Sequence, residues 1–410
     1  MEEWKEYKMQ KLGDYILDIA AGPFGSNLKV ECFVSSGFPI IDGANLRGFK
    51  VTDNVTKFVT EEKARSLYRS IAKRNDVVVT ISGNVGQISY IPFNSKYKEY
   101  LVSQRQFRAT FDTTKVYVPY LIYYFHTIEG QHKILSFANQ TGVPALAQPL
   151  KNFKNIDIQL PPLSKQKQIA SILSSFDNKI DCNRRINDNL EQQAQALFKY
   201  WFVDYEPFKD GEFVESELGM IPMGWRVGRL SEVANITMGT SPAGSSYNMS
   251  GEGDVFYQGR AEFGFRFPKR NMYTTKAKRF ADIDSVLLSV RAPVGDINVA
   301  DERCCIGRGL ASIQSREGNN SYILYLMKSL YPQFEKYNSE GTVFGCINKK
   351  ALEQLAVVTP PNETISRFDK ICSEIDGQIK ILDQETRRLA TLRDTLLPRL
   401  MSGKLKVNEL

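Results

Sequence analysis

The sequence is poor in the residues that build metal and redox sites. Its 410 residues include only two histidines, His126 and His132, and six cysteines that form no Cys-x-x-Cys pair. A structural zinc site needs such ligands at short, repeated spacings, so the sequence predicts no metal site. We expect the cysteines to be reduced, mostly buried thiols of a cytoplasmic protein.

Long apolar runs and nucleotide-processing motifs are also missing. No segment predicts a membrane span, and no N-terminal apolar run predicts a signal peptide. The chain has no GxxxxGK[ST] loop, and Leu160-Pro161-Pro162-Leu163 lacks the polar and aromatic residues of the motif with which amino-methyltransferases hold a flipped base. The glycine-rich stretch 22–26 follows no convincing strand. We therefore expect no catalytic residues and no cofactor bound by this chain.

What the sequence does contain is enough apolar material for more than one core. Hydrophobic residues make up 42% of the chain, and its length favours two domains. Lys and Arg number 53 against 46 Asp and Glu, which gives a formal net charge of +7. This sign suits a polyanionic partner, although a soluble basic protein without such a partner has the same composition.

The chain repeats itself. The offset between matching residues falls from 217 in the first pair to 199 in the last, and then stays at 199. Each half is therefore predicted to be a globular unit of variable length followed by a helical unit of constant length. Short β-branched runs alternate with turns and amphipathic stretches in the globular units, which indicates α+β domains. The matching pairs are Gly22 with Gly239, Val85-Gly86 with Val294-Gly295, Arg105 with Arg308, and Pro161-Pro162 with Pro360-Pro361.

Two long helices are predicted, one at the end of each half. No proline or glycine occurs from Gln166 to Trp201, and apolar residues recur at alternating spacings of three and four. This pattern favours an antiparallel coiled coil between the two helices, related by a pseudo-twofold axis, with Ile169 opposite Leu400. The alternative is that each helix covers only its own domain. The predicted seam comprises Ile169, Leu173, Phe176, Ile180, Asn183, Leu190 and Leu197 in the first helix and Phe368, Ile375, Ile379, Leu382, Leu389 and Leu396 in the second.

Three segments carry a family resemblance that covers essentially the whole chain. They are LPPLSKQKQIA (160–170) leading to ALFKYWFVDYEPF (196–208), ELGMIPMGW (217–225), and LRDTLLPRLMSGK (392–404). In this order they resemble the central region, the entry to the second recognition domain and the C-terminal region of the specificity subunits of type I restriction-modification enzymes.

The resemblance implies a domain plan and a set of partners. The plan is target recognition domain 1 at 1–160, a central helical region at 161–211, target recognition domain 2 at 212–359 and a C-terminal helical region at 360–410. Each recognition domain is implied to read one half of a bipartite, asymmetric target in double-stranded DNA. The helical regions are implied to bind two modification subunits, which bring S-adenosylmethionine. Restriction subunits, which use ATP and magnesium, can join that complex.

Two rival interpretations stay open at this point. One is the specificity chain of a fused restriction enzyme of another type, with the same architecture and a different enzymatic partner. The other is a coiled-coil scaffold whose duplicated domains bind proteins.

Both globular units are locally basic, as phosphate neutralisation requires. From Arg47 to Arg108 there are 12 basic and 5 acidic residues, and from Arg260 to Arg308 there are 10 and 6. Arg reads guanine and Asn or Gln reads adenine in the major groove. Arg105 and Arg308 are predicted to be equivalent and therefore to hold phosphate or structure, whereas Gln104 and Gln106 are expected to define sequence. The predicted DNA-binding residues are Asn45, Arg47, Asn84, Gln87, Gln104, Arg105 and Gln106, then Gln258, Arg260, Arg266, Lys269, Arg270, Arg291 and Arg308.

Overall fold

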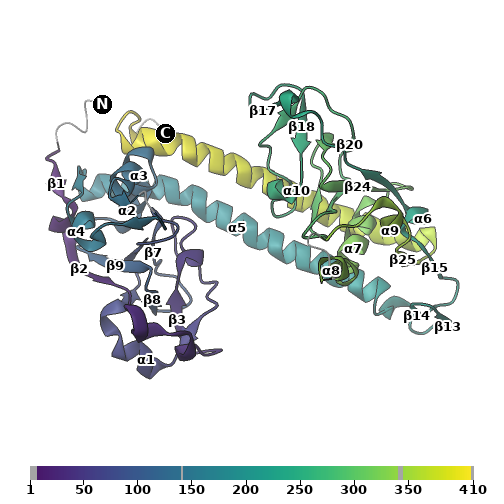
Figure 1. Cartoon of the computed structure of the whole chain (residues 1–410), viewed down its shortest axis with the longest axis horizontal. Coiled ribbons are helices and arrows are strands. Elements are labelled where there is room, and N and C mark those ends of the chain that lie inside the picture. Colours follow the sequence, from purple (N-terminus) through teal and green to yellow (C-terminus); the bar gives the residue numbers. More distant parts are fainter. Residues whose placement is uncertain (1–6, 140–141, 340–344, 408–410) are drawn as a thin grey trace. The chain divides into compact units, whose positions relative to one another are not determined.

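The computed structural model describes residues 7–139, 142–339 and 345–407. Its internal contacts divide the chain into two units: unit 1 contains the residues up to Asp181 and those from Glu385 onward, and unit 2 contains Cys182–Gln384. Two helices, α5 (Leu163–Phe202) and α10 (Asn362–Met401), each begin in one unit and end in the other (Figure 1). They start two residues after the limits of 161 and 360 predicted for the helical regions.

The globular part of unit 1 contains two four-stranded sheets. The order β2-β9-β6-β7 is antiparallel throughout, and in β4-β3-β8-β5 the β3 and β8 strands are parallel. Buried β-branched and aromatic residues fill the central strands, as expected for strands covered on both faces. The elements are β1 Gln10–Lys11, β2 Ile16–Ala21, β3 Phe38–Ile41, β4 Phe58–Val59, α1 Glu61–Ser66, β5 Ile71–Lys73, β6 Val77–Thr80, β7 Ile88–Tyr90, β8 Glu99–Val102, β9 Gln106–Phe111, α2 Val118–Phe125, α3 Ile128–Leu135, β10 Ala138–Asn139, β11 Ala145–Leu146, α4 Pro149–Lys154 and β12 Asp157–Ile158.

Unit 2 repeats this plan. Its sheets have the orders β16-β24-β21-β22 and β17-β19-β18-β23-β20, with β18 and β23 parallel. Its elements are β13 Phe213–Ser216, β14 Gly219–Pro222, β15 Arg226–Arg229, α6 Leu230–Val233, β16 Ala234–Met238, β17 Tyr247–Asn248, β18 Asp254–Tyr257, β19 Tyr273–Thr274, β20 Phe280–Ala281, β21 Val286–Ser289, β22 Ile297–Val299, β23 Cys304–Ile306, β24 Leu310–Ser315, α7 Asn320–Ser329, α8 Tyr331–Ser339, α9 Lys349–Glu353 and β25 Ala356–Thr359.

Equivalent backbone hydrogen bonds confirm the duplication and fix its register. The Gly22 N–H donates to the Gln106 carbonyl at 2.8 Å, and the Gly239 N–H donates to the Leu310 carbonyl at 2.9 Å. A Cβ at either glycine would lie within about 2 Å of a carbonyl oxygen, at 1.9 Å in the first copy and 2.1 Å in the second. Both positions therefore need glycine because the neighbouring strand connection passes too close for a side chain.

The two long helices pair antiparallel within each unit, as predicted. In unit 1 an ion pair of 2.6 Å joins Asp177 of α5 to Arg393 of α10. In unit 2 the rings of Trp201 and Phe368 lie 6.0 Å apart, in the same register as the predicted pairing of Ile169 with Leu400. The Asn187 side chain also donates to the backbone of α10 there, at 3.4 Å.

The helices cover the domains as well as each other. The core of unit 1 includes Ile169 and Leu173 from the start of α5 and Leu400 from the end of α10. The core of unit 2 includes Phe198 from the end of α5 and Phe368 from the start of α10. The two interpretations of the helices therefore hold together, because each helix has an apolar stripe wide enough for a partner helix and a domain.

The predicted seam is buried unevenly because the domains also determine which positions are covered. Leu197 is partly exposed, for example, while its neighbour Phe198 is buried against the domain core. Ile169, Leu173, Ile180, Asn183, Phe368 and Ile379 are buried; Phe176, Leu190, Leu197, Ile375, Leu382, Leu389 and Leu396 are partly exposed.

Phe368 offers a test of this packing. Its ring is fully buried and lies against the rings of Phe198, Phe202 and Tyr322. We predict that Phe368→Ala lowers the free energy of unfolding by about 3–5 kcal/mol, measured by chemical denaturation, because it leaves a cavity in the core. Ile381→Ala, at an exposed position of the same helix, is the control and should change it by less than about 1 kcal/mol. Equal effects of the two substitutions would contradict the packing.

Candidate nucleic-acid interface

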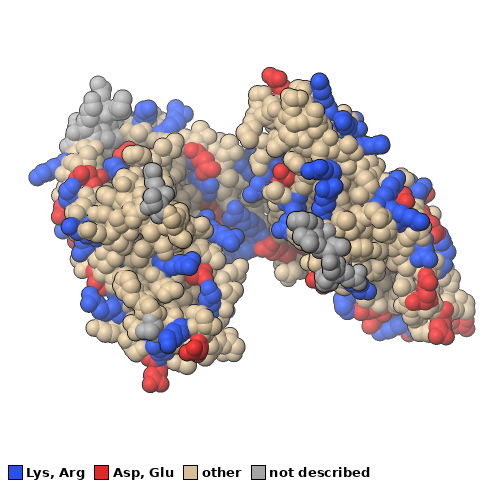
Figure 2. All heavy atoms as spheres, in the orientation of Figure 1, with Lys and Arg blue, Asp and Glu red and all other residues tan. Residues whose placement is uncertain are grey.

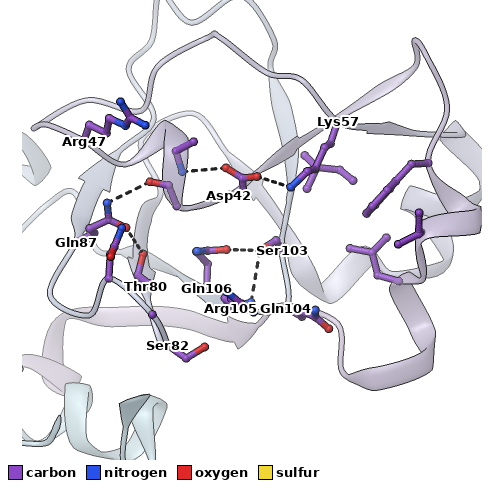
Figure 3. A pocket seen from close by; sticks show the side chains of 18 residues that line it. Asp42, Arg47, Lys57, Thr80, Ser82, Gln87, Ser103, Gln104, Arg105 and Gln106 are labelled. Atoms are coloured by element: carbon purple, nitrogen blue, oxygen red, sulfur yellow. Dashed lines mark hydrogen bonds and ion pairs between the residues drawn. The ribbon is translucent and has the colours of Figure 1, made fainter. Parts of the chain in front are cut away.

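A pocket of about 630 Å³ opens in unit 1 where three strands end (Figure 3). Loops leave β3 after Ile41, β6 after Thr80 and β8 after Val102, and their side chains surround the pocket. Its lining comprises Leu28, Val30, Phe33, Ile40, Asp42, Gly43, Ala44, Arg47, Lys57, Thr80, Ser82, Gly83, Asn84, Gln87, Ser103, Gln104, Arg105 and Gln106. Six of the seven predicted DNA-binding residues of the first domain are thus brought together.

Asp42 organises one wall of the pocket. Its carboxylate accepts from the Ala44 N–H at 2.9 Å and from the Lys57 ammonium at 2.8 Å. Burial alone would raise the pKa of Asp42, but Lys57 and the Ala44 N–H outweigh burial and hold that pKa below its ordinary value. The acid is therefore ionised and balanced by Lys57, which leaves the other cations of the pocket uncompensated.

Two glutamines of the pocket are engaged in holding its loops. Gln87 donates to the Gly43 carbonyl at 3.1 Å and accepts from the Thr80 hydroxyl at 3.0 Å. The Gln106 side chain is bonded to the Ser103 hydroxyl (Figure 3). Both side chains hold the loops that line the pocket. The expectation that Gln106 defines sequence is therefore corrected, because its side chain is buried and bonded within the protein.

The structure corrects the prediction for Asn45. It was predicted to bind DNA, yet it is buried and does not line the pocket. Its amide donates to the carbonyls of Thr52 and Asn54 at 3.2 and 3.0 Å, so it closes a loop of its own chain. Both amide hydrogens are thus used and the Oδ1 accepts from the Asp42 N–H at 3.1 Å, so this buried side chain has no donor left for a base edge.

Of the seven predicted residues of the first domain, four have exposed side chains that make no hydrogen bond or ion pair within the described part of the chain. They are Arg47, Asn84, Gln104 and Arg105. All four line the pocket. Together they offer guanidinium and amide groups, which are the groups that recognise guanine and adenine edges. With Asp42 already paired to Lys57, the two arginines make the pocket electropositive.

The second domain gathers its candidates at the corresponding end. The Ser103 N–H donates to Ile41 in the first copy and the Gly307 N–H to Tyr257 in the second, at 2.9 and 2.8 Å, so Gln258 follows the same strand end as Asp42. Arg291 corresponds to the pocket residue Ser82, since each forms the isolated bridge that follows the equivalent strand. The residues found around this end are Gln258, Arg260, Arg291 and Arg308, of which Arg260 is paired with Asp296.

The predicted equivalence of Arg105 and Arg308 is wrong by one residue. The Gln106 N–H donates to Ser103 and the Leu310 N–H to Gly307, each at 3.0 Å. Arg308 is therefore level with Gln104, and Gly309 with Arg105. The sequence comparison matched arginine with arginine inside a turn, whereas the backbone register of the flanking strands decides the alignment. The two domains consequently present different side chains at equivalent points.

The structure also corrects the prediction for Arg266. It was predicted to bind DNA, but only 3% of its side chain is exposed, and it is bound to Glu191, Asp376 and the Tyr325 hydroxyl. A buried, fully paired guanidinium cannot reach a duplex. Its neighbours on the chain, Lys269 and Arg270, are exposed, and Arg270 pairs with Asp301 and Glu302 at 3.2 and 2.6 Å.

Sequence reasoning missed Asp42, Lys57, Ser82 and Ser103 of the pocket. Asp42, Ser82 and Ser103 follow closely after buried strands, and Lys57 pairs with Asp42. Because loops at one edge of a sheet converge, that position in the sequence is the signal that could have found them. Figure 2 shows Lys and Arg over the visible face of both units, mixed with Asp and Glu. Among the described residues, no group of three His, Cys, Asp or Glu could hold a metal ion, and no helix is long and apolar enough to cross a membrane.

Comparison with known proteins places this geometry in a family. The model of the type I restriction modification DNA specificity domain matches residues 2–192 and 222–390. A putative type I restriction enzyme MjaX specificity subunit of Methanocaldococcus jannaschii is 36% identical over 293 residues, 70% of this chain and 68% of that protein. The type I restriction enzyme MjaIX specificity subunit of the same organism is 23% identical over 428 residues, 100% of this chain and 95% of the relative.

A solved structure agrees with these relatives at the level of the fold. The S subunit of a type I restriction-modification system from M. genitalium has a TM-score of 0.59 at 16% identity and covers 96% of both chains. The family model matches well over half of the sequence, in two copies that correspond to the two halves of the duplicated chain. The chain belongs to the family of type I restriction-modification DNA specificity proteins.

Proposed function

We propose that this chain is the sequence-reading subunit of a type I restriction-modification complex. Each globular domain reads one half of a bipartite, asymmetric target in double-stranded DNA. The observation that carries the proposal is the pocket of the first domain, where Arg47, Asn84, Gln104 and Arg105 are exposed, line one site and make no side-chain bonds within the described residues. The second domain offers a different set at the same strand ends, as two different half-sites require.

The chemistry of these side chains supports reading of base edges. A guanidinium forms two hydrogen bonds to the O6 and N7 of guanine, and a carboxamide forms two to the N6 and N7 of adenine. Gln104 and Arg308 occupy equivalent positions, so one point of the fold offers an amide in one domain and a guanidinium in the other. The remaining exposed cations suit phosphate contacts, which position the duplex without specifying its sequence.

The names of the relatives support a multi-subunit complex, because they are specificity subunits of type I restriction enzymes. The complex we propose contains two modification subunits that carry S-adenosylmethionine, and restriction subunits that use ATP and magnesium can join it. This chain contributes target choice and no catalysis, in the cytoplasm. A specificity chain of another restriction-modification type and a protein-binding scaffold are the rivals.

Methylation mapping tests the proposal. The chain is produced together with its modification partner in a host, and the host genome is sequenced for methylated bases. A single bipartite methylated motif supports the proposed function. Absence of any motif, together with absence of sequence-selective binding of duplex DNA by the complex, would favour the scaffold.

Arg105 gives a residue-level prediction. Arg105→Ala should weaken binding of the specific duplex by about 1–3 kcal/mol and relax discrimination at one base pair of the first half-site, because it removes a bidentate contact. The measurement is titration of the chain and its modification partner with the specific duplex and with single-base variants. Arg69→Ala removes an exposed arginine outside the pocket of the same domain and should leave discrimination unchanged. Unchanged discrimination in Arg105→Ala would remove this residue from the reading surface.

Exchange of a whole domain gives a second prediction. Replacing residues 212–359 by the second domain of another family member should change one half of the methylated motif and leave the other half intact. The reason is that each unit has its own core and its own set of candidate readers. Methylation mapping of the chimaera decides the matter, and a change in both halves would refute modular reading.

A further inference from the structure

Asp177 and Asp376 occupy equivalent positions in the two long helices and lie beneath the two domains. The hydroxyl of Tyr123 in α2 donates to Asp177, and the hydroxyl of Tyr325 in α7 donates to Asp376 at 2.7 Å. The two contacts therefore repeat one another. The charges that surround the two carboxylates do not repeat.

Around Asp376 in unit 2 the globular domain supplies the cations and the helices supply the anions. The reverse pair, Lys380 of α10 with Asp284 of the domain at 2.9 Å, involves a more exposed carboxylate. Arg266 binds Asp376 of α10 at 2.7 Å and also binds Glu191 of α5. Lys328 of α7 binds the other oxygen of Glu191. Burial alone would raise the pKa of Glu191, but Arg266 and Lys328 outweigh burial and lower it. Two carboxylates of the helices, the buried Glu191 and the partly exposed Asp376, thus face two cations of the domain.

Around Asp177 in unit 1 the helices supply both signs and the domain supplies none; the domain's cation Lys50 pairs farther along α5, with Asp181 at 3.2 Å. Arg393 of α10 binds Asp177 of α5 at 2.6 Å, with its guanidinium carbon 4.9 Å from the centre of the Phe49 ring. The His126 ring lies 4.4 Å from Phe49 and its Nε2 is bonded to the Ile88 carbonyl at 2.9 Å. Burial lowers the pKa of His126 from its ordinary value, so the imidazole is uncharged at neutral pH.

The residues that differ stand at matching positions of the duplicated chain. The Tyr90 N–H donates to Phe49 and the Val299 N–H donates to Arg266, at 3.1 and 2.9 Å, so Phe49 stands where Arg266 stands. His126 lies three residues after Tyr123, just as Lys328 lies three residues after Tyr325. On the helices, the constant offset of 199 pairs Arg393 with Ala194 and Glu191 with Ala390.

We propose that these contacts form a charge key that assigns each domain to its own half of the chain. The key of unit 2 is Arg266 and Lys328 on the domain against Glu191 and Asp376 on the helices. The key of unit 1 is a domain face that places no charge beside Asp177, formed by Phe49 and His126, against helices that already pair Asp177 with Arg393.

The energetic reason is that an unpaired buried charge is far more costly than an exposed one. The first domain placed on the helices of unit 2 would leave the buried Glu191 and the partly exposed Asp376 without cations. The second domain placed on the helices of unit 1 would bring Arg266 and Lys328 against Arg393. If the proposed function holds, the key also fixes which domain reads which half of the target.

The key is tested by converting unit 2 to the pattern of unit 1 in the full chain and recording thermal unfolding. We expect Arg266→Phe with Lys328→His to lower the unfolding temperature of unit 2 by roughly 5 °C or more. Adding Glu191→Ala and Ala194→Arg should restore most of that loss, because the new arginine then takes the place that Arg393 has beside Asp177. The charge count of the domain stays the same in the two variants.

A matched control removes the same two residue types from the same domain at exposed positions. Arg279→Phe with Lys278→His should shift the unfolding temperature by no more than about 2 °C, because both side chains are exposed and are far from the key. The proposal is overturned if the two-residue variant of Arg266 and Lys328 unfolds like the control. It is equally overturned if the four-residue variant is no more stable than the two-residue one, including the case in which neither folds.

A transposed chain extends the test to whole domains. A chimaera that carries residues 7–160 in place of 212–359 should fold only when Glu191→Ala and Ala194→Arg are present as well. The readout is cooperative unfolding, which does not depend on DNA, so failure of the key and failure of the proposed function give different results. Equal folding of the chimaera with and without the two helix substitutions would overturn the key.

Discussion

The pairing of α5 with α10 under the two domains is the constraint on which the structure depends. Each helix must cover its partner and a domain at once, and a narrow apolar stripe cannot do both. Phe198 and Phe368 widen the stripe of unit 2 and bury their rings against Tyr322 of the domain. A charge that is largely removed from water at this interface must be paired there. The ion pairs of Asp177 and Asp376 meet that requirement.

The candidate site also contains two kinds of polar side chain: some are hydrogen-bonded within the protein, and others are exposed. Asn45 and Gln87 donate hydrogen bonds to backbone carbonyls and so hold their loops in place. The side chains of Gln104 and Arg105 are exposed and make no such bonds. A base reader placed on a loosely held loop would lose affinity to the ordering of that loop on binding. The engaged amides hold the strand connections in place, so the free side chains start from a largely ordered frame.

Sequence reasoning succeeded where the pattern was local or of constant length. The helices and the duplication rest on spacings of three and four and on the constant offset of 199. It failed for Arg266, whose partners lie 75 and 110 residues away along the chain and cannot be read from its neighbours. It failed for the equivalence of Arg105 with Arg308 because residue type was matched in a turn, where only the hydrogen-bond register of the flanking strands fixes the alignment.

Exposed and buried differences between the two halves therefore obey different rules. At the strand ends, Gln104 of the first domain is equivalent to Arg308 of the second. Such an exchange of an amide for a guanidinium has little effect on folding, because both side chains are solvated. Under the domains, the exchange of Phe49 for Arg266 is tolerated only with compensating changes on the helices, because each buried charge must find its partner. Target choice is thus free to vary at the strand ends, while the place of each domain is held by the buried residues beneath it.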